Sequence, residues 1–362
     1  MSELAQMLGE SVQRLFGDHA DAAAAAVRDG WQAALWQQAQ ELGLSLTLVP
    51  EDQGGASGTW EDAYAVLQPA GYHQIPLPLA ESMLAARLCS DAGFDAPAGV
   101  ASVTPYCAGA LRAGGSELLF TGALRAVPWG RHSEAVLSVV AHEGALQLVL
   151  LPRAAARVEA GLNLAGEPRD TLHFDACRPL GLAPAQSREA RQLLEYCALA
   201  RLPQIVGALE SALARSIQYA TERKQFGRAI GQFQAVQQQL ALFGSDVAAV
   251  ACAVKAACRA AAGDASFQIA AAKLRANQAI GLATASAHQV HAAIGFTWDH
   301  PLHHATQRLW SWRSEWGNDR FWSERLGAAV AARGAENFWS DLTARDDASA
   351  GAGTSVGNAA DA

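Results

Sequence analysis

The chain has 362 residues, of which 51% are hydrophobic, and a formal net charge of −8 at pH 7. This length and apolar content indicate a large folded core and exclude a linker or a disordered protein. The acidic balance, without a dense stripe of Lys and Arg, argues against a nucleic-acid partner. A few cations or helix N-termini can still bind a small anion.

The six cysteines form no CxxC pair and lie mostly among Ala, Leu and Val. A free thiol in such surroundings behaves as a small buried hydrophobe, so we expect a reducing, cytoplasmic compartment. The first residues lack a basic segment followed by an apolar run, and no apolar stretch of about 18 residues is free of charge. We therefore expect neither a signal peptide nor a membrane span.

Residues 1–100 predict an N-terminal helical domain. Apolar residues recur at helical spacing, as at Val27, Trp31 and Leu35, and the segment Pro50 to Gly55 is a turn signal. A later helical run from Leu79 to Leu88 has prolines just before it, where the start of a helix tolerates them.

Residues 101–184 predict a small middle β domain. Short apolar runs with Gly or Pro nearby, typical of strands, occur at 118–122, 135–141 and 146–151. A unit this small is expected to pack on its helical neighbours rather than to stand alone.

Residues 185–340 predict a C-terminal four-helix bundle. Four long helix-compatible stretches are divided near 227–231, 263–264 and 295–301, and such stretches with short connections are typical of antiparallel bundles. The last residues, 341–362, become rich in Ala, Gly, Ser and Asp and predict a flexible tail. The predicted fold is therefore mainly α with a small β domain in the middle.

The most informative segment runs from Tyr219 to Gln237 and reads YATERKQFGRAIGQFQAVQ. It places a permanent cation, Arg223, one helical turn before a break in which Gly227 and Gly231 permit close backbone approach. An anionic diphosphate could bind there. From these residues alone, a solvated helix end followed by an ordinary turn remains the alternative.

This segment resembles the Arg-x-x-Phe-Gly signature of the acyl-CoA dehydrogenase family and its trailing Phe-Gln-Ala-x-Gln. The turn Val49 to Gly55 is similar to the family's Pro-Glu-x-x-Gly-Gly, and Gln289 to Phe296 is similar to its Gln-x-x-Gly-Gly-x-Gly. The resemblance implies three domains in the order given above. It implies an oligomer, either a homodimer or homotetramer or a heteromer with a sister subunit, and FAD bound between the subunits. It also implies an acyl-CoA substrate, as in fatty acid or sterol side-chain oxidation, and an electron-transfer flavoprotein as the acceptor.

The resemblance also implies which residues hold FAD. Arg223 would contact the diphosphate or adenine side, and Phe226 and Gly227 would shape that wall. The adenosine and diphosphate half would be bound across the subunit interface by Gln234 and by Gln289, Val290, His291, Ala292 and Ala293, where two alanines replace the family's usual glycines. Trp129 is the candidate neighbour of the flavin ring, with a packing role as the alternative.

The reaction implied by the resemblance is FAD-dependent α,β-dehydrogenation of an acyl-CoA thioester, which needs a carboxylate base. A gapless count from Gln289 places the usual Glu-Gly of the family on Trp316 and Gly317, which are then substrate-binding candidates. Tryptophan has no basic site for this work. Glu315, one residue earlier, is the candidate base if a local shift brings it into reach.

Four further alternatives remain open. Some family members draw the base from an earlier helix, where the counterpart here is Cys197 and Glu195 lies two residues away. The chain could instead be a base-lacking, FAD-binding subunit paired with a sister chain, or a non-catalytic structural partner. A flavin monooxygenase on the same fold is the last alternative.

Other chemistry finds no support in the sequence. The cluster of His300, His303 and His304 lacks the further ligands that a metal site requires, so no metal is expected. Gly-x-Ser-x-Gly, Walker-type and Gly-x-Gly-x-x-Gly motifs are absent from the sequence, which argues against hydrolase, NTPase and Rossmann functions.

Overall fold

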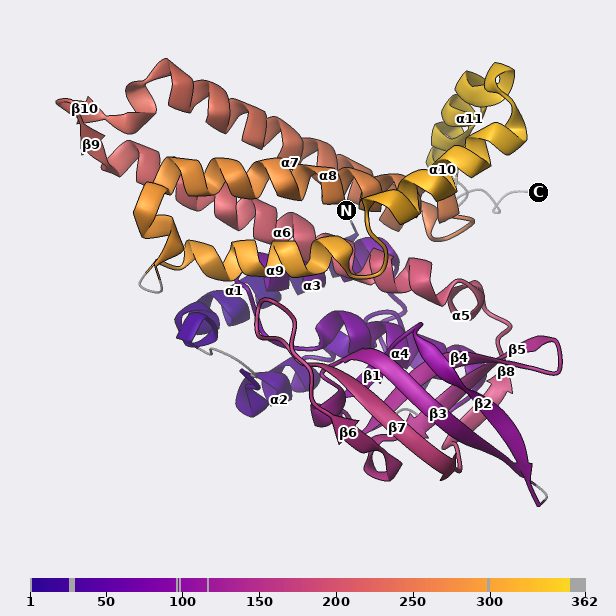
Figure 1. Cartoon of the computed structure of the whole chain (residues 1–362). Coiled ribbons are helices and arrows are strands. Elements are labelled where there is room, and N and C mark those ends of the chain that lie inside the picture. Colours follow the sequence, from indigo (N-terminus) through magenta and orange to yellow (C-terminus); the bar gives the residue numbers. More distant parts are fainter. Residues whose placement is uncertain are drawn as a thin grey trace, which may run out of the picture.

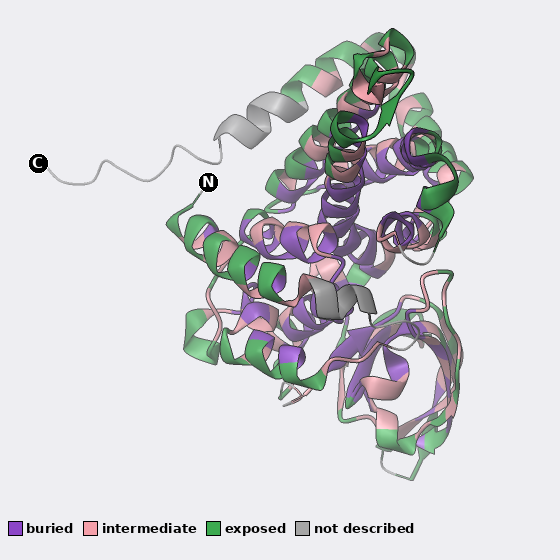
Figure 2. Cartoon of the chain, turned by 90° about the vertical axis from the view of Figure 1, so that its left-hand side faces the viewer, coloured by how far each residue is buried: buried purple, intermediate pink, exposed green. Residues whose placement is uncertain are grey.

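The computed structural model describes residues 2–25, 30–95, 97, 99–115, 117–297 and 300–351. A helical N-terminal layer, a β domain and a helical bundle follow one another along the chain (Figure 1). Buried residues are concentrated in the central helices and in the part of the β domain that faces them (Figure 2).

The N-terminal layer contains α1 (Glu3–Ala25), α2 (Ala33–Glu41), α3 (Trp60–Tyr72) and α4 (Leu79–Ala92). Two single turns, η1 (Leu44–Leu46) and η2 (Glu51–Gln53), lie between α2 and α3. Helix α3 begins with a capping box, in which the Thr59 hydroxyl accepts from the Asp62 amide and the Asp62 carboxylate accepts from the Thr59 amide. The predicted helix through Trp31 differs from the structure, because α2 begins only at Ala33, and Val27 lies outside the described residues.

The β domain consists of two four-stranded sheets. The first has the order β1-β4-β5-β8 and the second β2-β3-β7-β6, and only β1 and β4 pair in parallel. The strands are β1 (Ala101–Val103), β2 (Cys107–Gly114), β3 (Glu117–Pro128), β4 (Ala135–His142), β5 (Ala145–Pro152), β6 (Arg157–Glu159), β7 (Arg169–Cys177) and β8 (Gly181–Pro184). Short helices η3 (Gly130–His132) and η4 (Arg153–Ala155) connect them.

Alternation along β4 and β5 gives the first sheet two buried faces. Val136 and Val149 point into the core between the two sheets, whereas Leu137 and Leu150 belong to the large core shared with the helices. The runs are continuously apolar because both faces are covered. The β domain therefore packs on the helices, as expected from its size.

The C-terminal bundle is built from α6 (Leu193–Glu222), α7 (Gln234–Ala260), α8 (Ser266–His291) and α9 (Leu302–Ser314). A short α5 (Arg188–Arg191) precedes it, and β9 (Lys224–Gln225), β10 (Arg228–Ala229) and η5 (Ile230–Gln232) join α6 to α7. The turn η6 (Ala292–Phe296) follows α8. The predicted fourth stretch is two helices, since α9 ends at Ser314 and α10 (Asp319–Arg333) starts after a turn. The predicted fold class is confirmed.

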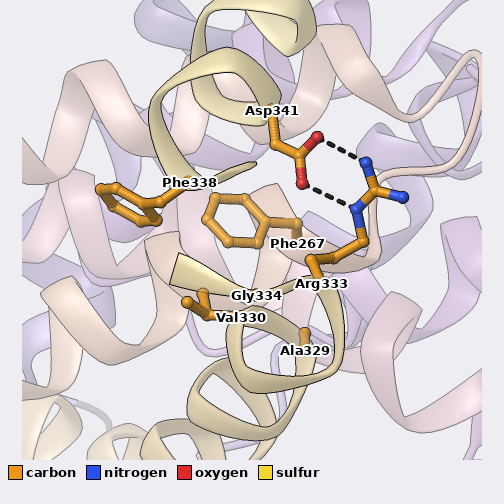
Figure 3. A pocket seen from close by; sticks show the side chains of 7 residues that line it. All are labelled: Phe267, Ala329, Val330, Arg333, Gly334, Phe338 and Asp341. Atoms are coloured by element: carbon orange, nitrogen blue, oxygen red, sulfur yellow. Dashed lines mark hydrogen bonds and ion pairs between the residues drawn. The ribbon is translucent and has the colours of Figure 1, made fainter. Parts of the chain in front are cut away.

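The chain continues through η7 (Ala335–Asn337) into α11 (Phe338–Gly351). The Arg333 guanidinium donates to both oxygens of Asp341 at 2.7 and 2.8 Å and holds α11 against the end of α10 (Figure 3). Phe267 of α8 and Phe338 lie beside this pair. Helix therefore extends into the segment predicted as a tail, and residues 352–362 lie outside the described part of the chain.

Helix α7 carries an exposed apolar face. Among the described residues it is the one helix long and apolar enough to cross a membrane by length and composition, yet it packs along α6 and α8 as a bundle member. Only 28% of its most apolar window is buried within the chain. Leu242 on α7 is 70% exposed and Leu282 on α8 is 64% exposed, so this side of the bundle is open to a partner.

Candidate functional site

Arg223 lies where α6 gives way to a hairpin. Strands β9 and β10 are joined by a two-residue turn at Phe226 and Gly227, whose φ angles are 52° and 82°. Both values are left-handed, as in a type I′ turn, and glycine supplies the second without steric cost. Arg223 is exposed and Phe226 is 92% exposed. The Arg223 guanidinium makes no ion pair with any residue that the structure describes.

Two helix ends complete this surface. Helix α7 begins at Gln234, and no side chain among the described residues caps it. The Val236 amide donates to the Phe233 carbonyl, which leaves the amides of Gln234 and Ala235 to face an anion. On α8, Gln289 is exposed, and its Oε1 accepts from Gln239 Nε2 at 3.0 Å, which ties α8 to α7. The chain leaves α8 through Ala292 and Ala293, both exposed.

His291, the last residue of α8, packs from the interior against the end of α6. It is 1% exposed, and its ring stacks on Tyr219 of α6 at a centroid distance of 4.7 Å, one turn before Arg223. Burial lowers the pKa of His291 and keeps the ring neutral. Val290 is also buried. The predicted segment thus presents Gln289, Ala292 and Ala293 to solvent at the C-terminal end of α8.

A second feature is the sharp turn after α9. Glu315 is extended, with φ −68° and ψ 135°, and Trp316 and Gly317 have φ angles of 60° and 107°. A Cβ atom on Gly317 would lie 2.4 Å from Nε1 of Trp322, so only glycine fits. Because α9 ends at Ser314, the directions of the Glu315 and Trp316 side chains do not differ by the roughly 100° per residue of a continuous helix.

Trp316 closes a small cavity. Its side chain is 2% exposed and stacks on Tyr106 of the β domain, with ring centroids 5.5 Å apart. The cavity measures about 10 Å³ and is lined from α4, β1 and α6 by residues including Leu84, Val103 and Cys197. This volume holds about one water molecule. Burial raises the pKa of the Cys197 thiol well above its usual value.

Glu315 does not line this cavity and instead joins a chain of buried ion pairs. Its two carboxylate oxygens accept from Arg169 at 2.9 to 3.2 Å, and Oε1 also accepts from Arg201 at 3.3 Å. Arg201 in turn binds Glu81 of α4, which lines the cavity. Burial disfavours the charge of Arg201, but Glu81, Glu315 and Glu167 outweigh this effect and raise its pKa.

The same chain continues through Glu167, in the segment before β7. Its oxygens accept from Arg169 at 3.2 Å, Arg308 at 3.1 Å and the Trp312 indole at 3.1 Å. Burial alone would raise the pKa of Glu167, but the guanidinium groups of Arg169, Arg308 and Arg201 lower it to about 2. Three carboxylates and three arginines thus connect the N-terminal layer, the β domain and the bundle.

Comparisons with known proteins identify the family of this chain. Residues 2–96 match the family described as "Acyl-CoA dehydrogenase, N-terminal domain" and residues 188–319 match "Acyl-CoA dehydrogenase, C-terminal domain". The chain is 30% identical over 310 residues to acyl-CoA dehydrogenase IpdE2 of Mycobacterium tuberculosis, which covers 82% of this chain and 88% of that protein. The chain belongs to the acyl-CoA dehydrogenase family.

Solved structures of this family show the same fold. The ChsE4-ChsE5 complex from Mycobacterium tuberculosis matches with a TM-score of 0.81 at 22% identity, over 91% of this chain and 98% of that chain. The steroid ACAD Tcur3481-Tcur3483 matches with a TM-score of 0.81 at 23% identity over the same shares. Family members are FAD-dependent oxidoreductases that act on acyl-CoA thioesters, so the predicted family and reaction class are confirmed.

The cavity brings together two residues that the sequence comparison with the family singled out. A gapless count predicts that Trp316 and Cys197 stand at the two positions where the family carries its base, and both residues line this one cavity. Neither is a carboxylate. Glu195 points elsewhere, to Arg325 of α10. Sequence reasoning did not single out Arg169, Arg201 or Glu81. For Arg201 in α6 and Glu81 in α4, a charge within an apolar helix was the available signal, whereas Arg169 begins strand β7 and had no such signal.

Trp129, the candidate for the flavin-ring contact, is buried. It is 3% exposed, and Trp31 lies against it with ring centroids 6.0 Å apart. Trp31 also stacks on His132 at 5.1 Å and 11°. Trp129 therefore packs against the segment before α2, and a direct contact with a flavin ring remains a prediction.

Proposed function

We propose that this chain is a base-lacking subunit of a heteromeric, FAD-dependent acyl-CoA dehydrogenase. The observation that supports this most directly is the cavity in which the two family base positions converge on Trp316 and Cys197. The carboxylate that lines the cavity, Glu81, is bound by Arg201. Glu315, which does not line it, has its oxygens engaged by Arg169 and Arg201. A sister chain would then supply the carboxylate that removes the α-proton of the thioester.

The residues around the hairpin fit the diphosphate half of FAD. Arg223 offers a guanidinium without an ion-pair partner in the described chain, and the uncapped start of α7 at Gln234 offers amides. Gln289 and the exposed backbone at Ala292 and Ala293 lie close by. When bound, FAD would supply the hydride acceptor for the β-carbon of the substrate. The contribution of this chain is to hold and orient the nucleotide.

Distance along α6 favours sharing of the cofactor between chains. Cys197 and Arg223 are 26 positions apart, and at about 1.5 Å per residue α6 separates them by about 39 Å. Arg223 is thus remote from the cavity of its own chain and suits an FAD bound by a neighbour.

The neighbour would cover the open side of the bundle. Leu242 of α7 and Leu282 of α8 form part of the exposed apolar surface there. The ChsE4-ChsE5 complex offers a precedent for assembly from two different chains, and Tcur3481-Tcur3483 for a steroid substrate. We therefore propose a bulky acyl-CoA, such as a sterol side-chain thioester, an electron-transfer flavoprotein as acceptor and a cytoplasmic location.

Co-purification from the native host tests the proposal. We expect a sister subunit with the family's Glu-Gly, FAD in the complex, and dehydrogenation that is lost when the sister glutamate is replaced. If this chain alone bound a full complement of FAD and oxidised an acyl-CoA at the rate of the complex, the proposal would be wrong. A complex in which Arg223→Ala leaves FAD affinity unchanged would favour a purely structural partner.

A further inference from the structure

Trp316 occupies a conformation that the local sequence does not favour. Its φ of 60° is left-handed, which costs a bulky side chain about 1 to 2 kcal/mol. Such a conformation persists only where surrounding contacts determine it. The turn therefore requires a support that outweighs this cost, in addition to the stacking of Trp316 on Tyr106.

Lys273 of α8 supplies that support. The residue is fully buried, and its Nζ donates to the carbonyls of Trp312 and Arg313 at 3.0 Å each and to the Gly317 carbonyl at 3.4 Å. A fourth acceptor, Asn277 Oδ1, lies at 2.7 Å. Lys273 thus binds carbonyls in the last turn of α9, before Trp316, and the carbonyl of Gly317, the residue after it.

Asn277 completes the arrangement one turn later on α8. It is fully buried, and its Nδ2 donates to the same Gly317 carbonyl at 3.2 Å. The two side chains form a clamp, by which we mean Lys273 and Asn277 with the carbonyls that they bind. The carbonyls of Trp312 and Arg313 lie in the last turn of α9, where carbonyls lack intrahelical partners and a cation is favoured. The Gly317 carbonyl lies in the turn between α9 and α10.

We propose that Lys273, with Asn277, is the positioning residue that keeps Trp316 inside the acyl cavity and so closes this subunit to an acyl chain. The inference rests on the proposed function, which it deepens by identifying what holds the base-lacking pocket shut. Trp316 is the occluding side chain, and Lys273 acts through it without touching the cavity.

Geometry carries the clamp, because four oxygens surround Nζ within 2.7 to 3.4 Å. Burial lowers the pKa of Lys273 to about 7; Glu315 and Asp319 favour the cation, and Arg201 and Arg313 oppose it. A methionine at this position would keep much of the volume but leave the carbonyls without a donor.

Cys197 reports on the cavity, because its thiol lines it behind Trp316. We would treat the full-length chain and its complex with N-ethylmaleimide and measure modification of each cysteine by peptide mass spectrometry. Cys258, buried on α7 outside the cavity, reports on global unfolding, and exposed Cys252 confirms that the reagent is active. The variants are Lys273→Met, Asn277→Ala, Trp316→Ala and, as a matched surface control, Lys255→Met.

We expect Lys273→Met to accelerate modification of Cys197 by roughly tenfold or more, since the buried acceptors around Nζ lose their donor, with Cys258 unchanged. Trp316→Ala should give at least the same acceleration, Asn277→Ala a smaller one, and Lys255→Met none. Unchanged Cys197 reactivity in Lys273→Met, or a parallel rise at Cys258, would overturn the inference. If Lys273→Met does not fold, unchanged Cys197 reactivity in Asn277→Ala overturns it. FAD content, measured separately, tests the proposed function independently of these thiol rates.

Discussion

Replacement of Glu167 by Gln should remove an acid-sensitive contribution to stability. In the folded chain the pKa of Glu167 is about 2, against an ordinary value of 4.5. At about 1.4 kcal/mol per pH unit, this difference stabilises the folded state by about 3 kcal/mol. Because the folded-state pKa is lowered, the contribution is complete above pH 4.5 and is lost as the pH falls toward 2.

The assay is urea unfolding of the chain and of Glu167→Gln from pH 7 down to pH 3. At pH 7 the variant should be less stable by about 3 to 5 kcal/mol, since Arg169 and Arg308 lose a buried partner. By pH 3 the difference in the free energy of unfolding between the two proteins should shrink by about 2 kcal/mol. Glu117→Gln, at an exposed carboxylate of β3, controls for general acid effects. A difference that stays constant over this pH range would refute the reasoning.

Three other predictions concern the proposed nucleotide site and the contact with the sister chain. Arg223→Ala should weaken FAD binding by the complex by roughly tenfold to a hundredfold, through loss of a charge-assisted contact; flavin fluorescence titration measures it, and Arg228→Ala, on the other side of the hairpin, is the matched control. Gly227→Ala should destabilise the hairpin by about 1 kcal/mol because φ is 82°, although a Cβ there would meet no atom within 4 Å; faster amide exchange at 224–229 with an unchanged melting temperature is the expected result. Leu242→Glu should prevent assembly with the sister chain yet leave the fold intact, since the side chain is 70% exposed; light scattering that still shows the complex would contradict it.

Much of the fold follows from local pattern. The runs at 135–141 and 146–151 predicted β4 and β5, and the helical spacing from Leu79 predicted α4. The break at 315–318 escaped prediction, because its one glycine, Gly317, is needed to avoid a tertiary clash with Trp322. Composition likewise missed the helical residues of α11, where the ion pair between Arg333 and Asp341 supports the helix start.

One part of the candidate site could likewise be predicted from the sequence, and another part could not. The helix break after Arg223 could be predicted, because a short motif contains both the cation and the glycine that the turn requires; the pairing of β9 with β10 was not predicted. The clamp and the ion-pair chain could not, since their partners are far apart in sequence: Lys273 binds a carbonyl 40 positions away, and Arg201 binds Glu81 across 120 positions. A buried charge in an apolar helix indicates that a partner exists but does not identify it.

The geometry of α6 is compatible with the proposed loss of a base and retention of a nucleotide site in one chain. Cys197 lies near the start of this helix and lines one cavity with Trp316, and Arg223 lies at its end, about 39 Å away along the axis. In the proposed assembly the two features would serve different sites: Trp316 would close the pocket of this chain, whereas Arg223 would reach the FAD of a neighbour. Changes at Trp316 should consequently leave FAD affinity intact, and changes at Arg223 should leave the cavity closed.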